Sequence, residues 1–209
     1  MAVADITKVH NVAITGHSGT GKTSLIEQIL HDAGVTTRRG HIEEGNTLCD
    51  FLEEELQHGH SVQLKPVHLA WKGARIHMID HPGYADFIGE VAATAPLVYG
   101  MIIVTEASSP VSVGSDNAWA YAERYGVPRA FLVNKLDKEN ASFKEAVQAL
   151  RETYGKRCVP LIVPLGEGAE FKGTVNILDH DEDSFSETLH QLHAEIQDAV
   201  AESNEALLE

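Results

Sequence analysis

Apolar positions along the chain follow two alternating patterns. Short, nearly continuous apolar runs bounded by polar residues are typical of strands buried on both faces. Longer stretches with apolar residues three and four positions apart are typical of helices. Strands are expected at residues 9–15, 62–71, 74–80, 98–104 and 130–134, and helices at residues 22–33, 84–95, 114–125 and 142–154. This alternation predicts an α/β fold whose mostly parallel sheet is covered by helices on both faces.

One pair of expected strands lies too close together for a parallel connection. Residues 62–71 and 74–80 are separated only by Lys72-Gly73, a two-residue link typical of a β-hairpin. A two-residue turn reverses the chain, so one strand must run antiparallel to the others. A mixed sheet is therefore expected, with one antiparallel strand.

The C-terminal part of the chain predicts one more helix. Residues 159–164 form a short extended run, and Ser184 and Glu187 then have the spacing of a helix capping box. The apolar positions that follow fall on one helix face. They are Phe185, Leu189, Leu192, Ile196 and Val200.

Composition indicates a folded protein without a membrane segment. The chain has 209 residues and is 43% hydrophobic, enough for a sizeable core. No apolar run approaches the roughly 20 residues that a membrane-spanning helix needs, and no signal peptide is recognisable. We expect a cytoplasmic protein with no membrane partner. Cys49 and Cys158 suit neither a disulfide framework nor a zinc site, and are interpreted as reduced structural thiols.

Charge is concentrated at the C-terminal end. The net charge is −15, and the segment from Asp179 to Glu209 holds ten acidic residues and no Lys or Arg. An acidic chain without a basic stripe is poorly suited to binding the nucleic-acid backbone. We expect no direct DNA binding, and favour nucleotides and proteins as partners.

A glycine-rich segment carries the first candidate chemistry. It follows the pattern G-x-x-x-x-G-K-[ST] between an expected strand and an expected helix, as this motif requires. Backbone N–H groups of such a loop bind phosphates, the lysine reaches the outer phosphates, and the last hydroxyl can bind Mg²⁺. Its residues are Gly16, His17, Ser18, Gly19, Thr20, Gly21, Lys22 and Thr23.

Two further motifs follow expected strands. Asp80-His81-Pro82-Gly83 places a carboxylate where it can hold the Mg²⁺ shell, and the Gly83 N–H can reach a terminal phosphate. Asn134-Lys135-Leu136-Asp137 places a carboxylate that can accept both N–H donors of guanine, a pair that adenine does not offer. The three motifs together predict a site for GTP or GDP with Mg²⁺.

With these motifs the sequence resembles the translational GTPases, and specifically the elongation factor G family with its elongation factor G-like paralogues. The similarity covers residues 11–179. Release factor 3 and the tetracycline-resistance ribosomal protection proteins have similar domains, but Tyr84 after Gly83 favours the elongation factor G-like group. Further segments share the resemblance: residues 43–47, 86–91, 125–129 and 170–173.

The resemblance implies a three-layer, Ras-like P-loop GTPase domain that hydrolyses GTP. Its first switch would be the loop of residues 36–61, and its second would follow Asp80. The Mg²⁺ ligands it implies are Thr23, Ser61 and, through the water shell, Asp80. Ribosome binding would belong to domains beyond this chain.

Four positions depart from the family near the terminal phosphate. Gly19 stands where elongation factors commonly have Asp, and Tyr84 where they have the histidine that orients the attacking water. Ser18 and His60 replace the apolar pair that flanks that histidine. A phenol can hydrogen-bond water but cannot become cationic, so slow hydrolysis is expected. His60 or His81 could substitute as the group that positions water, and both stay open at this point.

The resemblance also suggests how the chain is divided. Residues 1–159 would form the GTP-binding domain, and residues 160–209 a shortened insert subdomain with the acidic helix. The family's fifth guanine-nucleotide motif, with its final strand and helix, has no counterpart in this sequence, so a truncated domain is expected.

Two functions remain open from the sequence. The first is a GTPase in which Lys22 and Tyr84 are the catalytic candidates. The second is a guanine-nucleotide-binding switch that does not hydrolyse GTP, favoured by Tyr84, Ser18 and Gly19. An ATP-dependent kinase is disfavoured by the guanine-type motif at Asn134 and Asp137.

Overall fold

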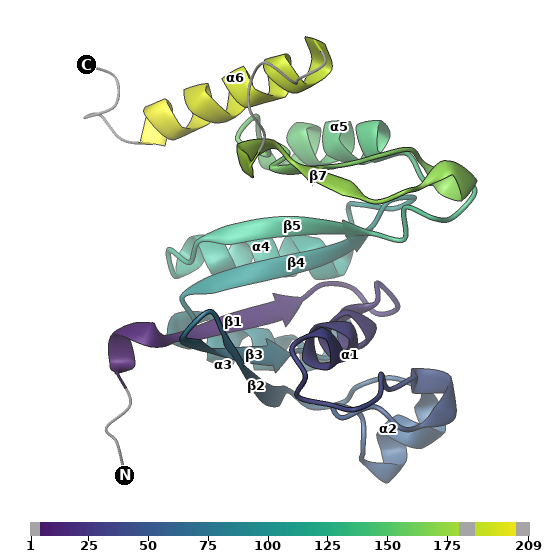
Figure 1. The fold of residues 1–209 in the computed structure, drawn as a ribbon. Helices are drawn as coiled ribbons and strands as arrows, with labels where there is room; N and C mark the ends of the chain where they lie inside the picture. Colours follow the sequence, from purple (N-terminus) through teal and green to yellow (C-terminus); the bar gives the residue numbers. More distant parts are fainter. Residues whose placement is uncertain (1–4, 180–186, 204–209) are drawn as a thin grey trace. The chain divides into compact units, whose positions relative to one another are not determined.

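The computed structural model describes residues 5–179 and 187–203 (Figure 1). The chain forms two compact units. The first comprises the residues up to Thr105 together with Ser112–Asn134, and the second comprises Glu106–Val111 with the residues after Asn134. The predicted helix cap at Ser184 lies outside the described residues.

The larger sheet has the order β2-β3-β1-β4-β5. β1 pairs parallel with both β3 and β4, whereas β2 pairs antiparallel with β3. The predicted α/β fold with one antiparallel strand is confirmed. The strands are β1 (Val9–Thr15), β2 (Lys65–Trp71), β3 (Ala74–Asp80), β4 (Gly100–Glu106) and β5 (Arg129–Asn134).

The hairpin between β2 and β3 forms at the predicted turn. Lys72 and Gly73 have φ values of 47° and 82°. Two successive residues with positive φ define the type I′ turn, whose twist matches that of the flanking strands. β2 begins three residues later than predicted, because the Val62 N–H bonds to the side chain of Glu55 and not to a neighbouring strand.

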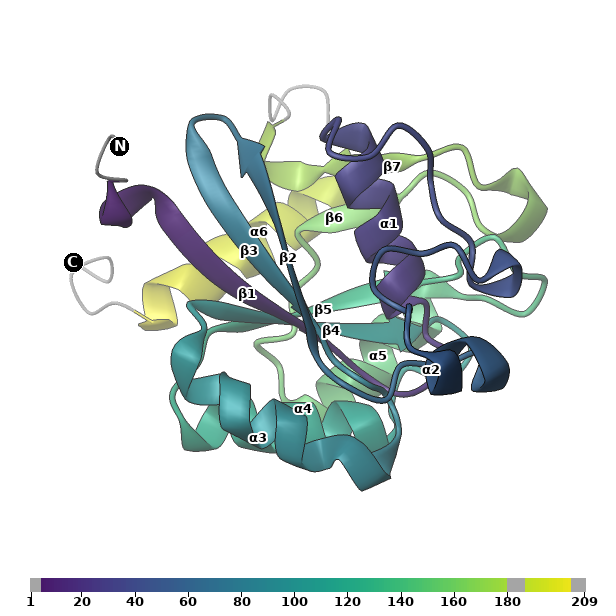
Figure 2. The ribbon, with the colours of Figure 1, turned by 90° about the horizontal axis from the view of Figure 1, so that it is seen from below.

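Helices cover both faces of this sheet (Figure 2). α1 (Lys22–Asp32) packs Ile26 and Leu30 against one face. On the other face, α3 (Ile88–Thr94) and α4 (Val113–Arg124) pack through Val91 and Ala118. The first unit is therefore the three-layer arrangement that the sequence predicts.

The segment between α1 and β2 contains more structure than predicted. Besides a 3-10 turn at Ile42–Glu44, it forms the short helix α2 (Glu53–His58). The predicted helix at 84–95 is likewise divided, into α3 and the flanking 3-10 turns Ala85–Phe87 and Ala95–Leu97. A further 3-10 turn, Ile6–Lys8, precedes β1.

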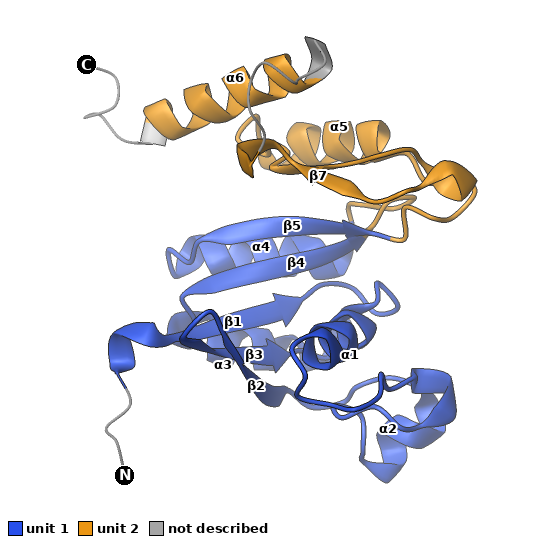
Figure 3. Cartoon of the chain, viewed as in Figure 1, with its two compact units in different colours: residues 1–105, 112–134 blue, residues 106–111, 135–209 orange. Residues whose placement is uncertain are grey.

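The second unit, orange in Figure 3, contains two helices and a small antiparallel sheet. Val163, Ile177 and Ile196 form its buried centre, with Leu189 and Leu192 packed around them. Of the predicted apolar face of the C-terminal helix, Leu189, Leu192 and Ile196 pack in this core, whereas Val200 is 48% exposed and Phe185 lies outside the described residues. The elements are α5 (Phe143–Tyr154), β6 (Ile162–Pro164), β7 (Thr174–Asn176) and α6 (Glu187–Ser203), with 3-10 turns at Gly168–Glu170 and Ile177–Asp179.

The second compact unit includes the chain from Lys135 onward, whereas the boundary expected from the sequence falls after residue 159. Phe143 of α5 packs into the same small core as β6, β7 and α6. Arg151 of α5 also forms an ion pair with Glu195 of α6. The boundary drawn from the family resemblance stays a prediction.

Candidate functional site

The phosphate-loop motif joins β1 to α1 in a geometry that requires its glycines. Gly16 has φ +135°, and a Cβ there would lie 2.2 Å from the Val104 carbonyl oxygen. Gly21 has φ +94°, and a Cβ there would lie 2.5 Å from Nδ2 of Asn134. Both positions therefore exclude any other residue. The loop is held close to β4 and β5 at the carboxyl edge of the sheet.

Lys22 is buried at the centre of this loop, 6% exposed. Its Nζ donates a hydrogen bond of 2.8 Å to the His17 carbonyl oxygen. Burial lowers the pKa of Lys22 to about 8, although the charges of Asp80 and Asp50 oppose the shift. A partly desolvated ammonium group interacts strongly with any anion that enters the loop.

Gly83 lies against the same loop. A Cβ on Gly83 would lie 2.5 Å from both the Lys22 Nζ and the Ser18 backbone nitrogen. The segment after β3 therefore brings its backbone to within contact distance of the phosphate loop, as the sequence predicts for a group that reaches a terminal phosphate.

Three predicted metal-site residues come together beside Lys22. The Thr23 hydroxyl donates a hydrogen bond of 2.8 Å to Oδ2 of Asp80, and lies 3.4 Å from the Ser61 hydroxyl oxygen. The other Asp80 oxygen, Oδ1, is buried and has no hydrogen-bond partner in the part of the chain that the structure describes. Burial raises the pKa of Asp80 to about 7, with the Thr23 hydrogen bond and the Lys22 charge opposing it.

Asp50, which the sequence reasoning missed, lies in the same cluster. It is 3% exposed, and within the described residues neither of its carboxylate oxygens has a hydrogen bond of good geometry, although the Ser61 hydroxyl lies nearby. Burial raises the pKa of Asp50, and the Ser61 hydroxyl opposes the shift. Its position between the apolar residues Cys49 and Phe51, in an otherwise acidic segment, was the available signal.

The cluster suits Mg²⁺. Hard divalent cations prefer carboxylate and hydroxyl oxygens. Thr23, Ser61, Asp50 and Asp80 offer only such oxygens, and two of the four residues carry buried oxygens that lack partners. A cation would compensate the cost of burying two carboxylates close together.

The first half of the switch segment is attached to α1 by a buried carboxylate. Glu27, 1% exposed, accepts the Gly40 N–H at 3.1 Å and the Leu48 N–H at 2.5 Å. This part of the first switch is therefore fixed in the structure by backbone groups bonded to a helix side chain.

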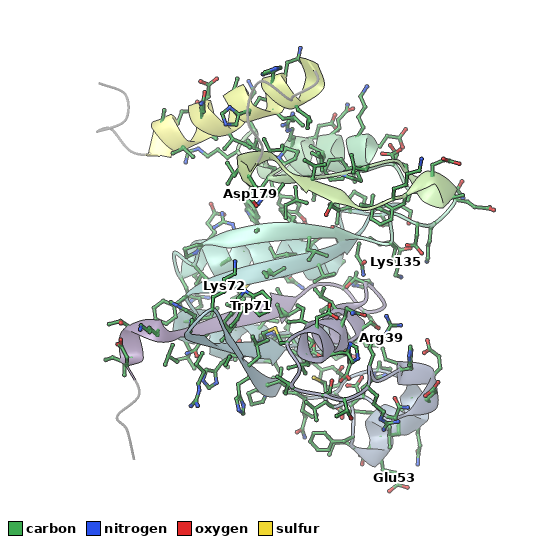
Figure 4. All side chains as sticks on the ribbon, viewed as in Figure 1. Arg39, Glu53, Trp71, Lys72, Lys135 and Asp179 are labelled. Atoms are coloured by element: carbon green, nitrogen blue, oxygen red, sulfur yellow. The ribbon has the colours of Figure 1, made fainter. Side chains whose placement is uncertain are left out.

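The guanine-type motif is divided between the two units. Asn134 ends β5 in the first unit, and its Nδ2 donates to the Thr20 carbonyl oxygen at 2.8 Å. In the first unit, then, Asn134 holds the phosphate loop. Lys135, labelled in Figure 4, has a φ of 60° and begins the second unit.

Within the second unit, Asp137 lines an open pocket, and Lys135 bonds to Glu106, which lines the same pocket. The Lys135 Nζ lies 2.8 Å from Glu106 Oε2, and the Lys138 Nζ lies 3.0 Å from Glu106 Oε1. Hydrogen bonds from Lys135 and then Lys138 lower the pKa of Glu106 to about 2. The pocket is lined by Glu106, Ser108, Asp137, Lys138, Glu139 and Asn140.

The positions that depart from the family differ in their surroundings. Tyr84 is 44% exposed, and its ring centre lies 4.4 Å from that of His60. The space beside Gly19 is open, because a Cβ there would meet nothing within 4 Å. His60 and Tyr84 therefore adjoin each other, from the first switch and the second.

His81 is excluded from a role in positioning water. It is fully buried, and its ring nitrogens lie 3.3 Å from the Ile14 carbonyl oxygen and 2.5 Å from the Thr94 hydroxyl oxygen. Burial lowers the pKa of His81 to about 4. His81 is thus a neutral core residue, and of the two candidates His60 alone adjoins Tyr84.

The described residues form neither a His, Cys, Asp and Glu metal cluster nor a membrane-spanning helix. Within residues 5–179 and 187–203, three or more His, Cys, Asp and Glu side chains do not gather into a metal cluster. Every helix in the same residues is too short or too polar to span a bilayer.

Comparison with known families decides what kind of domain carries this site. The profile of the elongation factor Tu GTP binding domain matches residues 7–205. The chain belongs to this family. A guanine nucleotide is therefore its ligand class, and the resemblance to the elongation factor G group seen in the sequence is confirmed by relatives and by a solved structure.

Individual relatives are 32% to 38% identical to this GTP-binding domain over the aligned residues. Ribosome-releasing factor 2, mitochondrial, from Bos taurus is 38% identical over 83% of this chain, and elongation factor G from Chlamydia caviae is 32% identical over 98%. The crystal structure of ttk003000868 from Thermus thermophilus covers 97% of the chain at 31% identity and a TM-score of 0.87. The chain spans 22%, 30% and 32% of the lengths of these three proteins.

Proposed function

We propose that this domain binds GTP with Mg²⁺ and hydrolyses GTP to GDP and phosphate, as the nucleotide-binding part of a ribosome-linked, elongation factor G-like protein. The observation that carries the proposal is the buried group of Thr23, Ser61, Asp50 and Asp80 beside Lys22. The family match supports guanine as the base. A cytoplasmic location is part of the same proposal, although one of the relatives is a mitochondrial factor.

Binding is divided among the three motifs. Backbone N–H groups of Gly16–Thr23 surround the phosphates, and the Lys22 ammonium group pairs with the outer ones. Asp137 accepts the two N–H donors of guanine, Lys135 holds Glu106 at the edge of the base pocket, and Asn134 holds the phosphate loop in place.

Thr23, Ser61 and Asp80 would hold Mg²⁺, with Asp50 as an additional buried carboxylate in its water shell. When bound, the ion neutralises charge on the phosphates.

Hydrolysis depends on positioning one water molecule. The water attacks the terminal phosphorus, the bond from that phosphorus to the bridging oxygen breaks, GDP leaves with the electron pair, and the protons of the water stay with the phosphate product. Lys22 stabilises the developing charge, the Gly83 N–H bonds the terminal phosphate, and the Tyr84 phenol hydrogen-bonds the water. A phenol orients water less effectively than an imidazole near neutral pH, so turnover is slow without a partner.

A guanine-nucleotide-binding switch without hydrolysis is the second candidate. The observations that favour it are the 44% exposure of Tyr84 and the open space beside Gly19. In that function the bound nucleotide would order the segment between α1 and β2 and report its state to a partner.

Single-turnover phosphate release distinguishes the two functions. The purified chain is mixed with radiolabelled GTP in excess Mg²⁺, and free phosphate is followed over time, with and without ribosomes. We expect slow release that is abolished by Lys22→Ala and unaffected by Lys72→Ala, which removes an exposed lysine at the hairpin turn. Saturable GTP binding with no release under either condition would favour the switch.

A further inference from the structure

A buried ion pair lies between the first switch segment and the sheet. Glu55 of α2 is 1% exposed and Lys65 of β2 is 7% exposed, and Lys65 Nζ lies 2.7 Å from Glu55 Oε1. Lys65 is the first residue of β2 and pairs in register with Asp80 of β3. Burying two charges costs desolvation that an apolar pair avoids, so a contribution to stability alone does not account for this pair.

The Glu55 carboxylate accepts hydrogen bonds from backbone N–H groups that precede and follow α2. Its Oε2 accepts the N–H groups of Phe51 and Leu52, both at 3.2 Å. Its Oε1 accepts the Val62 N–H at 3.1 Å, in addition to the Lys65 ammonium group. One side chain therefore fixes residues that are 11 positions apart in the sequence.

These backbone attachments lie next to two residues of the proposed metal site. Asp50 immediately precedes Phe51, and Ser61 immediately precedes Val62. Thr23 and Asp80 belong to α1 and β3, which fix them independently. Asp50 and Ser61 lie on irregular chain. The Asp50 N–H bonds to the Thr47 hydroxyl oxygen at 3.1 Å, and Glu55 holds the residue that follows Asp50 and the residue that follows Ser61.

Lys65 helps to keep the Glu55 carboxylate ionised, so that it can accept these backbone hydrogen bonds. Burial alone would raise the pKa of Glu55, but hydrogen bonds from Lys65, Val62 and Leu52 outweigh burial and the net shift is downward. An ionised carboxylate has two acceptor oxygens, which the four donors require. The Phe51 ring, 4.8 Å from Lys65 Nζ, adds a cation–π contact that ties the same segment to the lysine.

We propose that Lys65 is a positioning residue for the magnesium-dependent step: by holding Glu55, it fixes Asp50 and Ser61 beside Thr23 and Asp80. The Lys65 ammonium group bonds to Glu55, and its charge also acts on Asp50 and Asp80. The inference rests on the proposed function, because it assigns the ion pair a role in Mg²⁺-linked GTP binding.

The test measures the Mg²⁺ concentration that gives half-maximal GTP binding. We expect Lys65→Met to raise it about tenfold, because the side chain keeps its apolar length but leaves Glu55 without its cation. GDP binding in EDTA should stay unchanged, since the phosphate loop and base pocket are intact. Lys65→Arg should restore the wild-type value, and Lys72→Met, which removes an exposed lysine of the same hairpin, should not alter it.

A folded Lys65→Met variant with the wild-type Mg²⁺ requirement would overturn the inference. If Lys65→Met does not fold, Glu55→Gln combined with Lys65→Met removes both charges while leaving one acceptor oxygen. The double variant should raise the Mg²⁺ concentration for half-maximal GTP binding by the same factor. A wild-type Mg²⁺ requirement in the double variant would again overturn the inference.

Hydrogen exchange separates this inference from the proposed function. Amide exchange at Phe51, Leu52 and Val62 should be at least tenfold faster in Lys65→Met than in wild type. Faster exchange in a protein that shows no Mg²⁺-dependent GTP binding would contradict the proposed function while supporting the positioning of the segment. Unchanged exchange would contradict the positioning itself.

Discussion

At the residue scale, burial decides what individual carboxylates do in this domain. Asp50 and Asp80 are desolvated and retain unpartnered oxygens, so a cation is their natural complement. Glu106 instead faces two lysines, which keep it ionised. The sequence reasoning identified Asp80 because a motif surrounds it, and missed Asp50 because burial of an acid in a loop leaves no periodic pattern.

Asp50→Asn should weaken magnesium binding while stabilising the protein without ligand. We expect the Mg²⁺ concentration for half-maximal GTP binding to rise several-fold, and the free energy of unfolding without nucleotide to increase by about 1 kcal/mol, because a buried uncompensated charge is removed. Nucleotide titration and urea unfolding measure the two effects. Glu43→Gln, an exposed change in the same segment, should alter neither. A loss of stability in Asp50→Asn would contradict this assignment.

Tyr84→His should accelerate hydrolysis. An imidazole with a pKa near neutrality exchanges protons with water more readily than a phenol, so single-turnover phosphate release should rise about tenfold. Tyr125→His, at an exposed tyrosine after α4, is the matched control. An unchanged rate would show that the residue after Gly83 does not limit turnover.

The neighbour of Tyr84 allows a second test of the same chemistry. If His60 assists water positioning, His60→Ala should slow phosphate release in the wild-type background. An unchanged rate in His60→Ala would assign the His60 ring to packing against Tyr84 alone.

At the scale of elements, periodic patterns predicted the regular structure and left the switch segment undefined. β1, β3 and the hairpin turn at Lys72-Gly73 form where the sequence places them, since their signals are local. α2 and β7 were not predicted. Six and three residues are too short for a periodic signal, and α2 is held by bonds from Glu55 to residues three to ten positions away, which leave no periodic pattern.

The loops at the end of β4 and after β5 supply a pH-dependent contribution to stability. The pKa of Glu106 is about 2 in the folded protein, below its ordinary value of 4.5. A lowered carboxyl pKa contributes stability that is present above the ordinary value and is lost as pH falls towards the folded value. The free energy of unfolding of wild type should exceed that of Glu106→Gln by about 1–2 kcal/mol at pH 7.

This difference should shrink between pH 4.5 and pH 2, as urea unfolding across that range would show. Glu139→Gln, which removes an exposed acid from the same pocket, should follow wild type throughout. A difference that persists unchanged at pH 2.5 would contradict the ion-pair assignment.

At the scale of the whole molecule, the family match and the arrangement of motifs agree on guanine-nucleotide binding. The sequence could predict this function because each motif follows a strand of a recognisable sheet. It could not predict that the motif at residues 134–137 would be divided between two compact units, because compactness depends on packing around Phe143 and Ile177.

Guanine specificity is the central claim, and an equilibrium titration tests it most directly. Fluorescent GDP and GTP are titrated into the folded chain in Mg²⁺, with unlabelled ATP as competitor and Asp137→Asn as the specificity variant. We predict saturable binding that excess ATP does not displace. We also predict that Asp137→Asn shifts the preference towards xanthine nucleotides, since the Asn amide complements the edge of xanthine. Displacement by ATP, or no binding by a demonstrably folded chain, would contradict the claim.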